Sequence, residues 1–92
     1  MNSPAPNSSE FYVIETEDQF KDLMTNVRLM RGISQTDLAR TLGLPSQQYV
    51  SRMELELVGA KLGRCLDWTR ALGMELCIWD KPDAATGAAI GT

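Results

Sequence analysis

The sequence contains no histidine, only two cysteines and no long apolar run. It therefore lacks the ligands that a zinc site normally needs, and it shows neither an activated nucleophile nor a glycine-rich loop that could cradle a phosphate. No segment approaches the roughly 20 apolar residues that span a bilayer. Residues 1–10 have neither the charge nor the apolar block of a signal peptide. These absences predict a cytoplasmic protein with no metal, no other cofactor and no membrane contact, and they argue against an enzyme.

Both cysteines fall in segments that we expect to be regular. Cys65 lies in an expected helix and Cys77 in an expected strand. A disulfide between them is conceivable. In a reducing cytosol, however, buried thiols that pack as small apolar side chains are far more common. We therefore predict two buried cysteines that are not bridged.

The length of 92 residues allows one domain. A domain this small buries a modest share of its surface, so association of two copies is a common remedy. The net charge of −3 is unusual for a DNA-binding protein, but it is unevenly spread. Residues 28–70 carry seven basic and four acidic groups, residues 1–27 carry one and five, and residues 71–92 carry one and three. Because charges are screened beyond roughly 8 Å, a mildly basic middle can attract phosphate despite acidic ends.

The segment from Ser34 to Glu54 predicts two short helices separated by a glycine-centred turn. Ser34 is a favourable N-cap, with an acidic residue three positions later. Gly43 stands where a residue with positive φ is wanted, and Pro45 or Ser46 begins the second helix. Two short helices that cross in this way form a helix-turn-helix unit, whose second helix enters the DNA major groove.

The second helix would expose side chains that form hydrogen bonds, with almost no carboxylate among them. Val50 and Met53 point inward at helical spacing. The outer face then carries Gln47, Gln48, Tyr49, Ser51 and Arg52. Glutamine can pair with adenine and arginine with guanine, whereas a carboxylate would repel phosphate. The alternative is an ordinary helical hairpin with a solvated face, but such faces usually mix glutamate with lysine, so we favour the interpretation that this face reads DNA.

These residues resemble the Cro/phage-repressor (XRE) helix-turn-helix family. The resemblance runs from about Phe20 to Gly73. It rests on Gln35, on Asp-Leu-Ala at 37–39, on Leu-Gly-Leu at 42–44 and on Val-Ser-Arg-Met-Glu at 50–54. The turn at 45–48 is one residue longer than is usual in that family. The resemblance implies a mainly α, lambda-repressor-like domain of four to five helices.

The end of the domain resembles a smaller group of proteins within this family. A last helix leads directly into the alternating segment Met74–Trp79, an arrangement similar to that of HipB-like antitoxins. This likeness implies a bacterial, nucleoid-associated repressor that forms a homodimer, binds a palindromic operator and regulates its own type II toxin-antitoxin operon. It also implies a HipA-type kinase toxin as partner. Two alternatives stay open: an autonomous repressor of the same family without a toxin, and a mainly protein-binding module that neutralises a toxin.

A capping box at Thr16 and Gln19 predicts a first helix over about residues 17–31. Gly32 would end it. Its buried stripe would consist of Phe20, Leu23, Met24, Val27 and Met30. Before this helix, Phe11–Ile14 is a short β-favouring run that could be either a strand or an arm packed on the body.

Two arginines near the end of this helix have different predicted roles. The family resemblance implies a structural ion pair between Arg28 and Glu54, which ends the recognition helix. Arg31 lies nearer the helix end and is the better candidate for a phosphate contact. The predicted DNA-binding residues are Gln35, Ser46, Gln47, Gln48, Tyr49, Ser51, Arg52, Arg31, Lys61 and Arg64. Of these, Gln35, Arg31, Lys61 and Arg64 would contact phosphate, and Gln47, Gln48 and Arg52 would read bases.

The last helix is predicted over roughly residues 62–72. Its buried side chains would be Leu62, Cys65, Leu66, Thr69 and Leu72. Trp68 also lies on an apolar side of this helix. It either fills the core of one copy or joins a subunit interface, and the enrichment of aromatics in interfaces favours the second.

The segment after this helix alternates as a strand does. Met74, Leu76 and Ile78 share one face, and Glu75, Cys77 and Trp79 share the other. A lone strand cannot satisfy its own backbone, so it must pair with Phe11–Ile14, with its own copy in a second chain, or with both. We favour the second copy. The predicted dimerisation residues are Trp68, Met74, Leu76, Cys77, Ile78 and Trp79. The domain would thus span residues 11–80, between a disordered arm at 1–10 and a flexible tail at 81–92.

Overall fold

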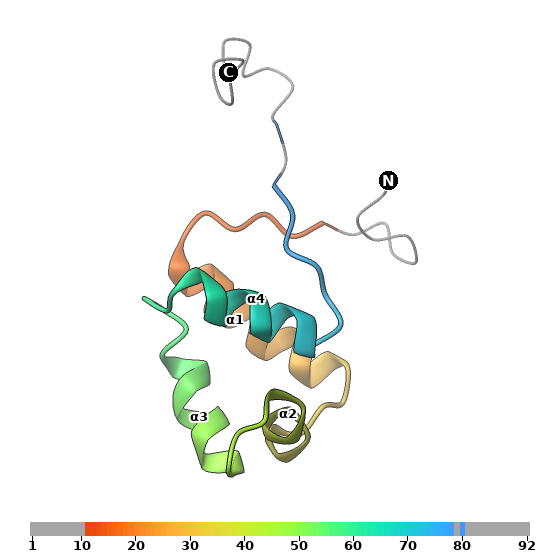
Figure 1. Ribbon diagram of the computed structural model, residues 1–92. Coiled ribbons are helices and arrows are strands. Elements are labelled where there is room, and N and C mark those ends of the chain that lie inside the picture. Colours follow the sequence, from red (N-terminus) through yellow and green to blue (C-terminus); the bar gives the residue numbers. More distant parts are fainter. Residues whose placement is uncertain (1–10, 79, 81–92) are drawn as a thin grey trace.

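The computed structural model describes residues 11–78 and 80. Within this part the chain forms four helices: α1 (Glu17–Met30), α2 (Gln35–Leu42), α3 (Gln47–Leu55) and α4 (Leu62–Ala71). In Figure 1, α2 and α3 lie at one end of the helical body, and residues 11–15 and 74–78 lie at the opposite end. The mainly helical character predicted from the sequence is confirmed. The predicted arm at 1–10, Trp79 and the predicted tail at 81–92 lie outside the described residues.

Helix α1 begins at the predicted capping box. The Thr16 hydroxyl accepts a hydrogen bond from the backbone N–H of Gln19 at 3.1 Å. In return the side-chain oxygen of Gln19 accepts one from the backbone N–H of Glu15 at 2.7 Å. The first bond satisfies an N–H group that the first turn leaves without a partner, and the second binds the residue that precedes the cap. The helix ends at Met30, one residue earlier than predicted.

The two helices predicted between Ser34 and Glu54 are both present. The Ser34 hydroxyl accepts from the backbone N–H of Asp37 at 2.9 Å and so caps α2. Gly43 ends α2 with φ of 73°, a left-handed conformation that costs glycine little. Helix α3 then begins after Ser46, whose backbone is extended. The turn is thus closed by local chemistry that the sequence already displays.

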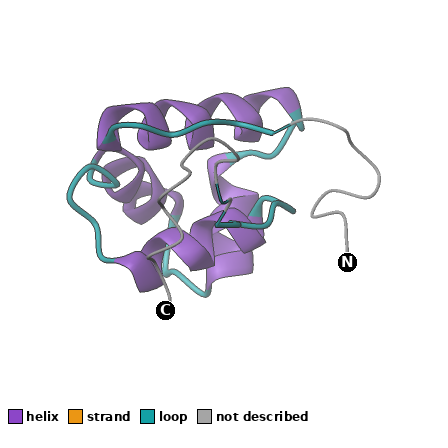
Figure 2. Ribbon diagram, turned by 90° about the horizontal axis from the view of Figure 1, so that it is seen from above, coloured by secondary structure: helices purple, strands orange, loops and turns teal. Residues whose placement is uncertain are grey.

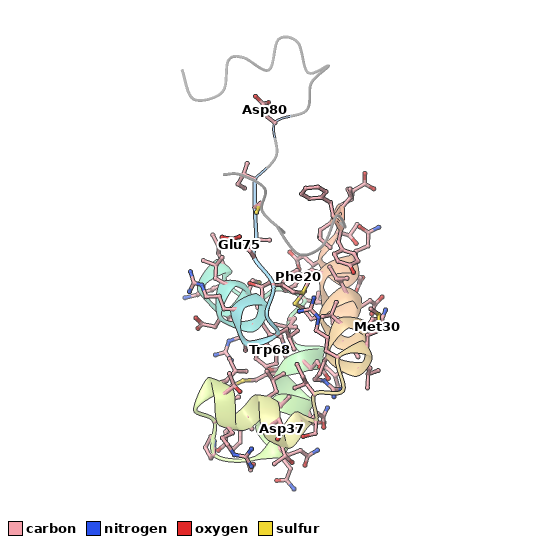
Figure 3. The ribbon with its side chains drawn as sticks, turned by 90° about the vertical axis from the view of Figure 1, so that its right-hand side faces the viewer. Phe20, Met30, Asp37, Trp68, Glu75 and Asp80 are labelled. Atoms are coloured by element: carbon pink, nitrogen blue, oxygen red, sulfur yellow. The ribbon has the colours of Figure 1, made fainter. Side chains whose placement is uncertain are left out.

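The core lies where the four helices meet. Its buried apolar residues are Phe20, Met24, Val27, Leu38, Ala39, Val50, Leu57, Trp68 and Leu72. Trp68 is 1% exposed, so it fills the core of a single copy, and the prediction that it lies in a subunit interface is wrong. Figure 3 shows Trp68 on the inner side of α4, facing the other helices. The prediction relied on the enrichment of aromatic residues in interfaces. A domain this small, however, needs its largest side chain for its own core.

Two side chains of the helices that were predicted to be buried are exposed. Met30 is 73% exposed, and Figure 3 shows it at the edge of the molecule. The buried residues of α1 are Phe20, Met24, Val27 and Arg28, so Met30, two residues after Arg28, falls on the opposite side of the helix. Leu62, in the first turn of α4, is 65% exposed, whereas Leu57, in the loop before this helix, is 2% exposed.

The C-terminal segment leaves α4 through a glycine turn. Gly73 has φ of 82°, and the backbone N–H of Met74 donates to the carbonyl of Thr69 at 2.8 Å. Met74 packs against the core, whereas Leu76 is 40% and Ile78 99% exposed. Figure 2 shows helices and loops but no strand among the described residues. Neither this segment nor Phe11–Ile14 forms a strand within the described residues, and pairing of the segment across a homodimer stays a prediction.

The cysteine prediction holds only in part. Cys65 and Cys77 are both free thiols, as predicted. Cys65 is half-buried, and burial raises the pKa of its thiol. Cys77 is exposed instead of buried, because its segment leaves the helical body.

The segment Phe11–Ile14 is likewise exposed and has no regular secondary structure. In the part of the chain that the structure describes, no helix has the length and apolar character needed to cross a membrane.

Trp68 and Leu62 lie on the same helix but differ in exposure, which allows the position of the core to be tested. Replacing Trp68 by alanine should lower the free energy of unfolding by about 3–5 kcal/mol, because a cavity replaces the indole. Replacing Leu62 by alanine should change it by less than about 0.5–1 kcal/mol, since that side chain already contacts water. Urea unfolding followed by circular dichroism at one protein concentration measures both values. Equal losses in the two variants would contradict this arrangement of α4.

Candidate nucleic-acid interface

Helix α3 presents a polar face that is free of acidic side chains. Gln47, Gln48, Tyr49, Ser51 and Arg52 are all exposed, as the sequence predicted. On the opposite side of the helix, Val50 is fully buried and fixes α3 on the core. The first turn of α3 contains no acidic residue. This face therefore offers hydrogen-bond donors and acceptors, and one positive charge, to a negatively charged ligand.

A buried ion pair holds α3 against α1. The Arg28 Nε atom lies 2.7 Å from Oε2 of Glu54, and Nη2 donates to Oε1 at 3.3 Å. Arg28 is 8% and Glu54 5% exposed. A third N–H group of Arg28, on Nη1, donates to the backbone carbonyl of Ile33 at 3.0 Å. The pair implied by the family resemblance is thus present, and it also holds the turn that leads into α2.

From this pair a chain of hydrogen bonds runs to the surface of α3. The side-chain amide of Gln35, at the start of α2, donates to Oε1 of Glu54 at 3.3 Å. The carbonyl oxygen of the same amide accepts a hydrogen bond from Nε2 of Gln47 at 2.7 Å. A side-chain amide carries two N–H groups, so each glutamine keeps one for a further partner. Both glutamines were predicted as DNA-binding residues, but their contact was not predicted, although they are the first residues of consecutive helices.

The remaining side chains of the α3 face differ in how they are held. The guanidinium carbon of Arg52 lies 5.3 Å from the centre of the Tyr49 ring, one helical turn away, in a cation–π contact. Gln48 and Ser51 bind no other side chain among the described residues. The Ser46 side chain forms no cap hydrogen bond, so its hydroxyl is available to a ligand. The face therefore combines fixed groups with groups that can adjust to a partner.

Two carboxylates near this face, those of Glu54 and Asp37, are bound by arginines. Glu54 is bound by Arg28, as described above. Asp37, in the first turn of α2, lies 3.1 Å from Nη1 of Arg40. Hydrogen bonds from Ser34, together with Arg40, hold the pKa of the Asp37 carboxyl below its ordinary value. It stays ionised at neutral pH, and its charge is countered by Arg40 at the surface.

The predicted phosphate ligands outside α3 have different surroundings. Arg64 lies beside the C-terminal half of α3, where its guanidinium contacts the sulfur of Met53. Lys61 is the N-cap residue of α4 and is exposed. Arg31 was predicted to contact phosphate. In the structure its Nη1 donates instead to the backbone carbonyl of Leu72 at the end of α4. This structural contact was missed because it joins residues far apart in the sequence.

The predicted dimerisation residues lie away from this face. Leu76, Cys77 and Ile78 are exposed in the C-terminal segment, at the end of the molecule opposite α2 and α3. Figure 3 shows the same separation, with Glu75 and Asp80 far from Asp37 on α2. Met74 lies half-buried at the base of this segment. Contacts between two copies through this segment would leave the α3 face open.

No protein-family model, no curated protein sequence and no solved structure matches this chain. The resemblance to the phage-repressor family therefore rests on the residues of the chain itself.

The buried ion pair predicts an uneven response to mutation. Replacing Arg28 by methionine leaves the Glu54 carboxylate buried without a counter-charge, and this should lower the free energy of unfolding by about 3–5 kcal/mol. The double variant Arg28→Met/Glu54→Leu should recover most of that loss, because neither charge is then stranded. Urea unfolding followed by circular dichroism measures each variant.

The exposed arginine Arg70 provides the control. Its side chain is 70% exposed and lies 3.9 Å from Asp67, so Arg70→Met should leave the stability close to that of the wild type. If the losses from Arg28→Met and Glu54→Leu simply add in the double variant, the two groups do not act as a pair.

Proposed function

We propose that this protein is a sequence-specific DNA-binding repressor that acts as a homodimer, with α3 as its recognition helix. The observation that supports it most is the α3 face, which exposes amide, hydroxyl and guanidinium groups without a carboxylate. Arg28, Glu54, Gln35 and Gln47 link this face to the core through successive hydrogen bonds. A preorganised polar face of this kind suits recognition of base edges in the major groove.

In this proposal the residues divide between positioning and reading. Gln47, Gln48 and Arg52 would reach base edges, and Tyr49 and Ser51 would contact phosphate or thymine methyl groups. Gln35 stands at the N-terminus of α2, where backbone N–H groups and the helix dipole favour a phosphate. Lys61 and Arg64 would add phosphate contacts from α4. Figure 1 places α2 and α3 together at one end of the molecule, as such a division requires.

A homodimer would join the two chains at the other end of the molecule. Pairing of the segment 74–79 with its copy would satisfy its backbone and cover exposed Leu76 and Ile78. The two α3 helices would then lie about one helical turn of DNA apart, roughly 34 Å, in successive major grooves. Doubling the contacts also offsets the weak phosphate attraction of a chain with a net charge of −3.

The likeness of the C-terminal half to HipB-like antitoxins extends this proposal to a second partner. In this extension the dimer also binds a HipA-type kinase toxin and represses the operon that encodes both proteins. An autonomous repressor and a mainly toxin-binding module are the two competing functions. No structural feature among the described residues favours either of them over the antitoxin.

A binding experiment separates these functions. DNA from upstream of the gene is tested by fluorescence anisotropy at moderate salt, alone and with the product of the neighbouring gene. We expect two chains per site, with specific binding at least about 10³-fold tighter than binding to a scrambled sequence. A kinase-like neighbour that strengthens the complex supports the antitoxin, and strong DNA binding that no neighbour affects supports the autonomous repressor. Equal binding to both sequences would refute the DNA-reading role of α3.

The division between base and phosphate contacts yields a further prediction. Gln48→Ala should lose discrimination at one base pair of each half-site, by about 1–3 kcal/mol, and should bind the other substituted sites as the wild type does. Lys61→Ala should weaken binding to all sequences alike and reduce the salt dependence by about one counterion per contact. Competition anisotropy with singly substituted operators measures both. Uniform weakening by Gln48→Ala would reverse its assignment to a base.

A further inference from the structure

Two arginines at the C-terminal end of α1, Arg28 in its last turn and the C-cap residue Arg31, bind different parts of the molecule. Arg28 binds Glu54 of α3 and the carbonyl of Ile33. Arg31, three residues later, donates to the backbone carbonyl of Leu72, which follows the last residue of α4. Residues at this spacing share one side of a helix, so the two arginines keep a fixed relation to each other. One rigid turn therefore contacts both the recognition helix and the exit of the C-terminal segment.

The exit itself is a tightly bonded turn. The N–H of Gly73 donates to the carbonyl of Arg70 at 3.0 Å, and that of Met74 donates to the carbonyl of Thr69 at 2.8 Å. These are the two bonds of a Schellman motif, in which the left-handed residue is glycine. The motif does not use the carbonyl of Leu72, and Arg31 satisfies it with a positively charged donor at the negative end of the helix dipole.

The Arg31 side chain also lies against the turn. A Cβ atom added at Gly73 would lie 3.1 Å from Nη1 of Arg31, so the guanidinium occupies the space beside this residue. On the other side, Met74 packs against the core. The backbone of residues 72–74 is thus held by its own helix, by the core and by α1. The contact with the end of α1 comes from the same stretch of chain that binds Glu54 of α3.

We propose that Arg31 is a positioning residue that fixes the direction in which residues 74–78 leave the domain. The inference has a second step, which rests on the proposed function. In the dimer, the direction of this segment sets the separation of the two recognition helices and hence the preferred spacing of the operator half-sites. The segment and α3 lie at opposite ends of the molecule (Figure 1), so a small rotation at Gly73 displaces α3. A displacement of about 3.4 Å corresponds to one base-pair step.

The first step is tested without DNA, on the full chain, by NMR. Arg31→Met should lower the hydrogen-exchange protection of the Met74 N–H by about tenfold or more and increase the backbone motion of residues 75–78. Arg31→Lys, which keeps a charged donor, should restore much of the protection. Arg70→Met removes an equivalent exposed charge from α4 and should behave as the wild type. Amides of α3 should keep their protection in all variants.

Two outcomes of this measurement would overturn the proposal. One is unchanged protection of Met74 in Arg31→Met. The other is an equal loss of protection in α3, because Arg31 would then support stability in general rather than the exit direction.

The second step is tested with operators whose half-sites are moved apart or together by single base pairs. The wild type should prefer one spacing by about tenfold or more, and Arg31→Met should reduce this preference to about threefold, whereas Arg31→Lys should keep most of it. If Arg31→Met keeps the wild-type spacing profile, Arg31 does not set the spacing. A wild type that binds no sequence specifically would refute the proposed function, and the NMR result would still decide whether Arg31 fixes the segment.

Discussion

The buried ion pair between Arg28 and Glu54 is the interaction on which the rest of the arrangement depends. It joins α1 to the end of α3, and through Ile33 it also fixes the turn before α2. Glu54 then provides the acceptor for Gln35, which in turn accepts from Gln47. Each bond orients the next group, so the position of the Gln47 side chain on α3 follows from a buried charge pair.

The helix starts and most helix ends could be predicted because their signals are local. Thr16 and Ser34 accept backbone hydrogen bonds from residues three positions later, and Gly43 takes the left-handed conformation that ends α2. Such contacts depend on a few neighbouring residues and are therefore visible in the sequence. The exposed face of α3 was predictable for a similar reason, because helical spacing places Val50 inside and the polar residues outside.

The contacts between elements could not be predicted in the same way. Periodicity shows that Trp68, Met30 and Leu62 lie on apolar sides of their helices, but it does not show which other element covers each side chain. Trp68 is covered by the rest of the core, whereas Met30 and Leu62 are not covered. The contact of Arg31 was not predictable for the same reason, since its partner Leu72 lies at the end of a different helix, α4. The pairing of the C-terminal segment, with a second copy or with Phe11–Ile14, also stays a prediction, because alternation shows the two faces of a strand and not its partner.

Stability alone does not account for the polar groups on the inner side of α1. Apolar residues of similar volume in place of a buried ion pair are often neutral or stabilising, so Arg28 and Glu54 need not make the domain more stable than an apolar pair would. An apolar pair, however, would offer Gln35 no acceptor. The Gln35 side chain would then no longer be held in place as the partner of Gln47. The choice of charged residues at these two positions is therefore explained by orientation, because the pair holds polar groups of α2 and α3 in one arrangement, as the proposed DNA-reading surface would require.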